Sequence, residues 1–270
     1  MYNLYMRKTK NSIGIFDSGL GGLTILKEVR RAMPHENIIY FGDSAHVPYG
    51  SKSKETVSQF SLDIAKFLES KKVKLILVAC NTASALALDT LKKHISVPIL
   101  GVITPGAKAA TQTKSKNIFV IGTRATVKSG AYAKEIKKLN KQAKVKQIAC
   151  PLFVPLIEEG LAGDKITKLV IEKYLKEIKK AGLCTLILGC THYPVIKENI
   201  AKFLPKVILV DSAKEITKEA KLLLEKENLL NKKGKGKIEL FVSDSPKNFS
   251  ALAKTILGFN LKAKEIRFYI

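Results

Sequence analysis

The chain has 270 residues, of which 46% are hydrophobic and 26% are charged. These proportions are those of ordinary folded proteins, and they exclude disordered and fibrous classes. The length allows one large domain or two modest ones. The formal net charge of +24 is extreme, but the lysines are spread over nearly every segment, so we interpret most of them as solvated surface.

The sequence contains no pattern typical of secretion or of a membrane span. The N-terminal residues are basic and lack an apolar segment, and the apolar runs elsewhere are too short to cross a bilayer. We therefore expect a cytoplasmic protein with no membrane association. Four cysteines in so long a chain do not indicate a disulfide framework. Reduced thiols are expected, and these are available for chemistry.

Short apolar runs rich in β-branched residues alternate with longer stretches of helical period. This alternation predicts βα units and an α/β fold with mainly parallel sheets. The glycine-interrupted stretch 231–237 lacks the spacing of a phosphate-binding loop and predicts a plain connection. In chain order the expected strands are 12–16, 37–41, 75–79, 99–102, 118–121, 145–148, 186–188, 207–209 and 238–241, and helices are expected at 56–70, 167–181 and 246–257, among others.

A weak internal repeat divides the chain into two halves. Residues 75–82 and 186–192 both form an apolar run that ends in a cysteine followed by small polar residues. The intervals from the first expected strand of each half to its cysteine also agree, since 80 − 17 = 63 and 190 − 123 = 67. We expect two pseudo-symmetric α/β domains with the active site in the cleft between them. The short segment after 237 is too small to stand alone and should pack on the first half.

The repeat places Cys80 and Cys190 at the carboxyl ends of two strands. Ligands of open α/β sheets bind outside these ends, so the two thiols should face each other across one cleft. Racemisation of an amino acid removes the Cα proton on one face and returns a proton on the other. Two opposed thiols, one ionised and one protonated, suit this reaction without a cofactor.

Each of these cysteines could instead be a small buried hydrophobic residue. The polar residues that follow them favour chemistry, because a helix N-terminus at Cys80 would bind a carboxylate and lower the thiol pKa. Cys150 and Cys184 lack such neighbours, and we interpret them as structural. The polar neighbours are Asn81, Thr82 and Ser84 after Cys80, and Thr191, His192 and Tyr193 after Cys190.

Other candidate motifs are weaker. Cys190 and His192 have no second cluster to complete a zinc site, so we expect no metal. The glycine-rich turn 17–22 has Thr24 where a dinucleotide loop needs its third glycine. Instead, its amides could approach a small anion, with Asp17 and Ser18 facing the cleft.

Turn residues at 43–44 and 48–50 are of the kind that lines a cleft, and Asp211 is expected to cap a helix. The remaining histidines, His35, His46 and His94, show no pattern and are interpreted as surface residues.

The sequence resembles the glutamate racemase family, part of the aspartate/glutamate racemase superfamily, over nearly its whole length. No single motif would suffice, but several are specific in combination. The segments that carry the resemblance are residues 14–22, 40–50, 79–84, 101–105, 122–132, 150–158 and 188–194.

The resemblance implies interconversion of L- and D-glutamate, with the D form feeding peptidoglycan synthesis, and it suggests a homodimer. It implies a first domain of residues 1–102 plus 218–270 and a second of residues 103–217. Cys80 and Cys190 would act on opposite faces of Cα, Asp17 would assist Cys80, and His192 with Glu158 would assist Cys190. The substrate would be held by Asp17, Ser18, Pro48, Tyr49, Gly50, Asn81, Thr82, Thr123, Thr126, Thr191 and His192.

Three alternatives remain open. An aspartate racemase or related isomerase would use the same pair of cysteines, and a side-by-side assay of both amino acids discriminates the two. A nucleic-acid-binding protein would gather its lysines on one surface and bind in a salt-sensitive way. A periplasmic-type binding module would have a similar two-lobed plan but no need of paired thiols.

Overall fold

A computed structural model describes residues 9–113 and 115–268, and its strands form two parallel sheets. In the first sheet the strand order is β10-β9-β2-β1-β3-β4, and in the second it is β6-β5-β7-β8. The strands are β1 (Ile13–Asp17), β2 (Ile38–Gly42), β3 (Leu75–Val78), β4 (Ile99–Gly101), β5 (Asn117–Gly122), β6 (Lys144–Ala149), β7 (Cys184–Gly189), β8 (Val207–Asp211), β9 (Ile238–Val242) and β10 (Ala263–Glu265).

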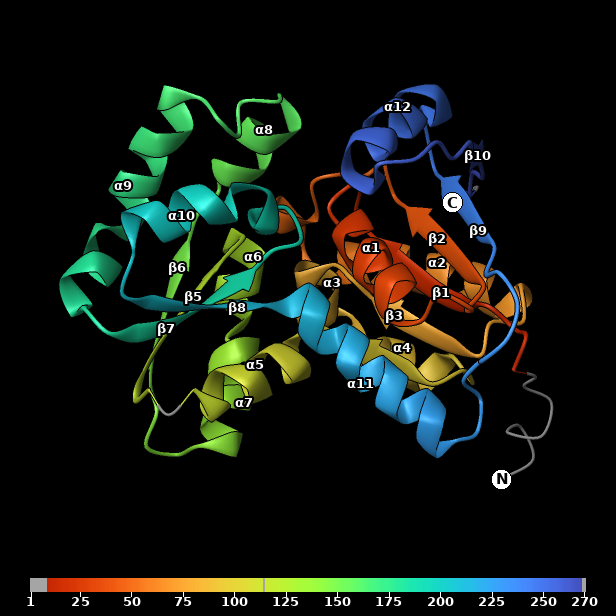
Figure 1. Ribbon diagram of the computed structural model, residues 1–270, viewed down its shortest axis with the longest axis horizontal. Helices are drawn as coiled ribbons and strands as arrows, with labels where there is room; N and C mark the ends of the chain where they lie inside the picture. Colours follow the sequence, from red (N-terminus) through yellow and green to blue (C-terminus); the bar gives the residue numbers. More distant parts are fainter. Residues whose placement is uncertain (1–8, 114, 269–270) are drawn as a thin grey trace.

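Helices cover both faces of each sheet, as expected for strands that are apolar on both sides (Figure 1). On the first sheet α1, α11 and α12 pack on one face and α2, α3 and α4 on the other. On the second sheet α8, α9 and α10 lie opposite α5 and α7. The helices are α1 (Leu23–Ala32), α2 (Lys54–Ser70), α3 (Asn81–Leu86), α4 (Leu88–His94), α5 (Ile103–Gln112), α6 (Arg124–Ser129), α7 (Ala131–Leu139), α8 (Phe153–Glu158), α9 (Lys165–Ala181), α10 (Lys197–Phe203), α11 (Ser212–Lys226) and α12 (Pro246–Leu257), with short 3₁₀ helices η1 (Tyr49–Ser51) and η2 (Tyr193–Ile196).

The two halves repeat one topology. The order β2-β1-β3-β4 in the first sheet corresponds to β6-β5-β7-β8 in the second, and every pairing is parallel. This confirms the pseudo-symmetric α/β fold. The segment after the 231–237 loop returns to the first half, where β9 pairs with β2. Each expected strand is present, with ends shifted by at most two residues.

The structure adds two features that the sequence did not suggest. Strand β10 extends the first sheet beyond β9. Lys74 and Glu36 form an ion pair with both side chains fully buried, 2.5 Å between Nζ and Oε2. Lys74 also donates to the carbonyls of Thr9 and Leu229, so this lysine joins three distant segments inside the first half.

Helix α11 connects the two sheets. It leaves β8 in the second sheet and runs along the first half (Figure 1). Ala213 and Ile216 belong to the core of the first sheet. The expected domain boundary between 217 and 218 therefore falls inside this helix. We propose the junction between β8 and α11 as the boundary instead.

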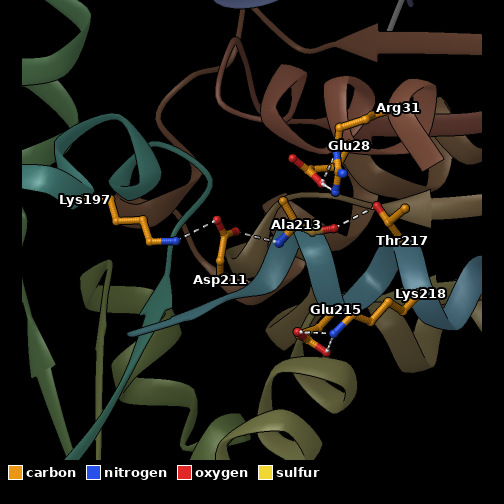
Figure 2. A network of polar contacts seen from close by, with 8 residues as sticks. All are labelled: Glu28, Arg31, Lys197, Asp211, Ala213, Glu215, Thr217 and Lys218. Atoms are coloured by element: carbon orange, nitrogen blue, oxygen red, sulfur yellow. Dashed lines mark hydrogen bonds and ion pairs between the residues drawn. The ribbon is translucent and has the colours of Figure 1, made fainter. Parts of the chain in front are cut away.

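The start of α11 is fixed by polar contacts on both sides of Asp211 (Figure 2). Asp211 Oδ1 accepts a 3.0 Å hydrogen bond from the N–H of Ala213, which confirms it as the helix N-cap. Lys197 lies 3.6 Å from the other oxygen. Within the part of the chain that the structure describes, no helix is long and apolar enough to cross a membrane.

Candidate active site

The candidate site lies where the carboxyl ends of the two sheets meet. In the first sheet β1 and β3 are neighbours, so Asp17 at the end of β1 comes beside Cys80, two residues after β3. In the second sheet β5 and β7 are neighbours, and Gly122 pairs with Gly189, immediately before Thr123 and Cys190. In each sheet the chain passes from the first of these two strands to a neighbour on one side, and from the second to a neighbour on the other side. Such a switch point is the usual place of the binding crevice in parallel sheets.

Cys80 is the N-cap of α3 and is only 5% exposed. Its Sγ accepts from the N–H of Ala83 at 3.5 Å and lies 3.7 Å from Ser18 Oγ. The N–H of Ala83 at this helix N-terminus acts to lower the thiol pKa, as expected, but it does not set the net shift. Burial, together with the charge of Asp17, outweighs the Ala83 hydrogen bond and raises the pKa of Cys80 to about 12. In this conformation Cys80 is a protonated thiol at neutral pH.

The carboxylate of Asp17 is completely buried and fully engaged. Oδ2 accepts from the N–H groups of Gly19 and Gly22, at 3.1 and 3.0 Å. Burial raises its pKa above the ordinary value, although the charge of His192 and these backbone donors oppose the shift. A side chain at Gly22 would come within 2.5 Å of the Asp17 Cβ, so the glycine-rich turn is required for this close wrapping.

Cys190 is 6% exposed and is followed by a hydrogen-bonded chain of ionisable groups. Its Sγ lies 3.8 Å from Nδ1 of His192, and Nε2 of the same imidazole lies 3.1 Å from Glu158 Oε1. Burial disfavours a charged imidazole, but the bonds with Cys190 and Glu158 outweigh it and raise the pKa of His192 to about 10. At neutral pH this imidazole is therefore protonated, which places a cation beside Cys190 Sγ.

Hydrogen bonds across the two halves bring the expected substrate-binding residues together. The hydroxyl of Thr191 donates to Asp17 Oδ1 at 3.3 Å. Thr82, from the first half, lies 2.9 Å from Thr123 and 3.2 Å from Thr126, oxygen to oxygen, and the last two are 3.0 Å apart. These three hydroxyls form hydrogen bonds with one another, and each can rotate to donate a hydrogen bond to an anionic group.

The segment 48–50 is held by a buried carboxylate that the sequence marked only as a turn residue. Asp43 accepts from Tyr49 Oη at 2.5 Å, and it lies 2.8 Å from His46 Nδ1. His46 is not a simple surface residue as expected, because its ring stacks on Phe60 with centroids 4.0 Å apart. The second support of Asp43 comes from the C-terminal segment, where Ser243 donates to it at 2.7 Å.

Of the residues expected to bind the substrate, Gly50 and Pro48 have surroundings unlike those of the others. Gly50 packs so closely on Thr123 that an added Cβ would lie 2.6 Å from the threonine Cβ. Pro48 is exposed, whereas Tyr49 beside it is buried. The site residues that the sequence did not single out are Tyr132, Ser212 and Ser243. Cys150 and Cys184 are free thiols in the core of the second half.

Nothing in residues 9–113 and 115–268 gathers three or more histidine, cysteine, aspartate or glutamate side chains in a way that could hold a metal ion. The ionisable groups of the site act on one another instead. What the arrangement offers is a protonated thiol in one half and a thiol beside a cationic imidazole in the other. Such a pair can exchange protons with a group bound between them.

The family model for Asp/Glu/Hydantoin racemases matches residues 23–220. The chain therefore belongs to this family of racemases. The curated relatives place it among the glutamate racemases. The glutamate racemase of Geobacter metallireducens is 49% identical over 93% of this chain and 94% of its own length. The glutamate racemase of Thermus thermophilus, solved with β-chloro-D-alanine, is 44% identical with a TM-score of 0.88, covering 97% of this chain and 98% of that one. That of Francisella tularensis, solved with D-glutamate, is 40% identical with a TM-score of 0.90, covering 96% and 98%.

Proposed function

We propose that this protein interconverts L- and D-glutamate, without a cofactor, by proton transfer between Cα and the thiols of Cys80 and Cys190. The observation that carries the proposal is the equivalent position of the two thiols. Cys80 follows β3, which pairs with β1, and Cys190 follows β7, which pairs with β5. These are equivalent places in two halves of the same topology. The glutamate racemases among its relatives support the choice of substrate.

The two thiols differ in their surroundings, and this difference assigns their starting roles. Cys80, with its pKa raised to about 12, holds a proton at neutral pH and is ready to donate it. Cys190 Sγ lies 3.8 Å from Nδ1 of a cationic His192, and we assign it the removal of the Cα proton. After one turnover Cys190 carries the proton taken from Cα and Cys80 is left as the thiolate. The reverse direction starts from this state with the two thiols in exchanged roles, and proton exchange with solvent restores the first state.

The neighbouring groups assist in this scheme. Asp17 and Ser18 lie on the Cys80 side, and His192 with Glu158 on the Cys190 side. The hydroxyls and amides of both halves hold the substrate's carboxylates and ammonium group. These donors are Ser18, Tyr49, Gly50, Asn81, Thr82, Thr123, Thr126 and Thr191, with Pro48 shaping the same segment.

The first test replaces each cysteine by alanine. We expect Cys80→Ala and Cys190→Ala to lose racemisation by a factor of at least about 10³, because no second group can complete the proton transfer. Cys150→Ala and Cys184→Ala remove equally buried thiols outside the site and should keep activity. The measurement is the change of circular dichroism with D-glutamate and, separately, with D-aspartate, on metal-free protein under reducing conditions.

Activity that survives the loss of either site thiol would contradict the two-base scheme. Turnover of aspartate alone would show that aspartate, and not glutamate, is the substrate. A sharper form uses Cys→Ser variants and a glutamate analogue with a leaving group at the β-carbon, whose elimination needs only one base. Each variant should process one enantiomer, and equal loss with both would argue against separate faces.

We further propose that the protein is a cytoplasmic homodimer that supplies D-glutamate for peptidoglycan. The family resemblance supports this role. Expression of the wild-type chain should restore growth of a bacterium that requires D-glutamate, and the Cys80→Ala variant should not. Light scattering on the purified protein measures whether its mass is that of a dimer.

A further inference from the structure

Asn81 carries a buried amide nitrogen that lacks a hydrogen-bond partner among the residues that the structure describes. The side chain comes directly after Cys80 and is only 2% exposed. Its other end is satisfied, because Oδ1 accepts a 2.7 Å hydrogen bond from the hydroxyl of Tyr132. Unpaired buried donors are costly, so this nitrogen points to a ligand oxygen.

Tyr132 belongs to the other half, on α7, and is held rigidly there. The ring is fully buried and is enclosed by Gly106 and Gly189, where an added Cβ would lie 3.3 and 3.2 Å from its ring carbons. Its hydroxyl also lies 3.3 Å from Oγ of Ser212, the first residue of α11. The phenol therefore has little freedom to leave Asn81.

The side-chain amide is planar, so a fixed Oδ1 also fixes the direction of Nδ2. Without the Tyr132 hydroxyl the group could turn by 180° and present its oxygen, which repels a carboxylate. We propose that Tyr132, supported by Ser212, is a positioning residue that sets the Asn81 amide to donate to a carboxylate oxygen of the substrate. The inference rests on the proposed function for the identity of that substrate.

The contact has a further consequence because its partners come from different halves. Asn81 follows β3 of the first sheet, whereas Tyr132 follows β5 and Ser212 follows β8 of the second. The donor is oriented only when the halves lie together as they do here. Binding of the carboxylate and closure of the site thus favour each other.

The test measures the Kd of D-glutamate by calorimetry on a Cys190→Ala background, where turnover does not disturb the titration. Tyr132→Phe should raise Kd by about tenfold, the effect of losing one buried orienting hydrogen bond. Ser212→Ala should raise it less. Asn81→Asp keeps an acceptor for Tyr132 but replaces the free donor by an acceptor, so it should raise Kd more than Tyr132→Phe does.

A double-mutant cycle separates positioning from general weakening. On an Asn81→Ala background, Tyr132→Phe should leave Kd unchanged. The control is Thr185→Val, which removes a buried hydroxyl that lies 2.6 Å from the hydroxyl of Thr113. It should lower the unfolding temperature comparably but leave Kd as in the parent.

The outcomes discriminate between the two proposals. The positioning role is wrong if Tyr132→Phe leaves Kd unchanged, or if it raises Kd by the same factor on the Asn81→Ala background. It is also wrong if Asn81→Asp binds D-glutamate as tightly as the parent. If the wild-type protein binds glutamate but does not racemise it, the proposed function fails and the positioning role still stands on its Kd values. Absence of any glutamate binding overturns both.

Discussion

At the scale of single residues, the chemistry of the site depends on which groups are charged, and His192 is decisive. Its pKa of about 10 lies well above the ordinary value near 6.5. A raised pKa means that the folded protein holds this proton more tightly than the unfolded chain. The contribution to stability is therefore complete below about pH 6.5 and is lost as the pH rises toward 10.

We predict that Glu158→Gln lowers the pKa of His192, because a neutral amide supports the imidazolium less than a carboxylate at 3.1 Å does. The variant should also lose less stability than the wild type between about pH 6.5 and 10. NMR titration of the histidines and denaturant unfolding at several pH values measure both effects. Glu159→Gln, which alters the neighbouring exposed carboxylate, serves as the control. An unchanged His192 pKa in Glu158→Gln would contradict the assignment.

Several residues of the site were predictable and others were not. Cys80 and Cys190 stood out because the repeat put each at a strand end beside polar residues. Tyr132 lies 51 positions from Asn81, and Ser243 lies 200 positions from Asp43, so no local pattern could link them. The net rise of the Cys80 pKa was not predicted because near-complete burial, which the sequence does not reveal, outweighs the lowering effect of the helix N-terminus.

At the scale of elements, the strands were predictable because β-branched runs stand between turn residues. Strand β10 was missed because Ala263–Glu265 is short and carries two charged residues at the sheet edge. Between the two halves η1 packs on the start of α6, and this close approach depends on Gly50. A side chain there has no space unless the halves move apart.

We predict that Gly50→Ala reduces kcat/KM by at least about tenfold while changing the free energy of unfolding by no more than about 1–3 kcal/mol. The new methyl group would lie 2.6 Å from Thr123 Cβ, so η1 must shift away from α6 and separate the substrate-binding groups. Steady-state kinetics and thermal unfolding provide the measurement. Gly163→Ala, with no atom near the added Cβ, is the matched control and should behave as wild type. Full activity in Gly50→Ala would show that this contact is dispensable.

At the scale of the whole molecule, part of the positive charge lies beside the candidate site. A groove of about 690 Å³ is lined by Gly50 of the site and runs between the start of α2 and α6. Potentials of one sign in a groove raise the rate at which ions of the opposite sign arrive. The cations that line it are Lys52, Lys54, Arg124 and Lys128, and they outnumber the one lining carboxylate, Glu55.

We predict that replacing these four cations by glutamine lowers kcat/KM for glutamate at low ionic strength and flattens its dependence on salt, with kcat unchanged. The control replaces Lys226, Lys232, Lys233 and Lys235, which lie outside the groove. Both variants go from +24 to +20, since 24 − 4 = 20. Equal loss in both would assign the effect to net charge alone, and no loss in either would exclude electrostatic attraction of the substrate.

The return of the chain to its first sheet has a consequence for biosynthesis. Strand β2 acquires its outer neighbour β9 only after the entire second half has been made. On the ribosome, the continuous segment that contains β5 to β8 can therefore complete its sheet while β2 still presents an unpaired edge. The second half should therefore complete its fold before the first half does, which reverses the usual order of folding from the N-terminus. The unpaired edge of β2 is the surface that a nascent-chain chaperone would need to shield.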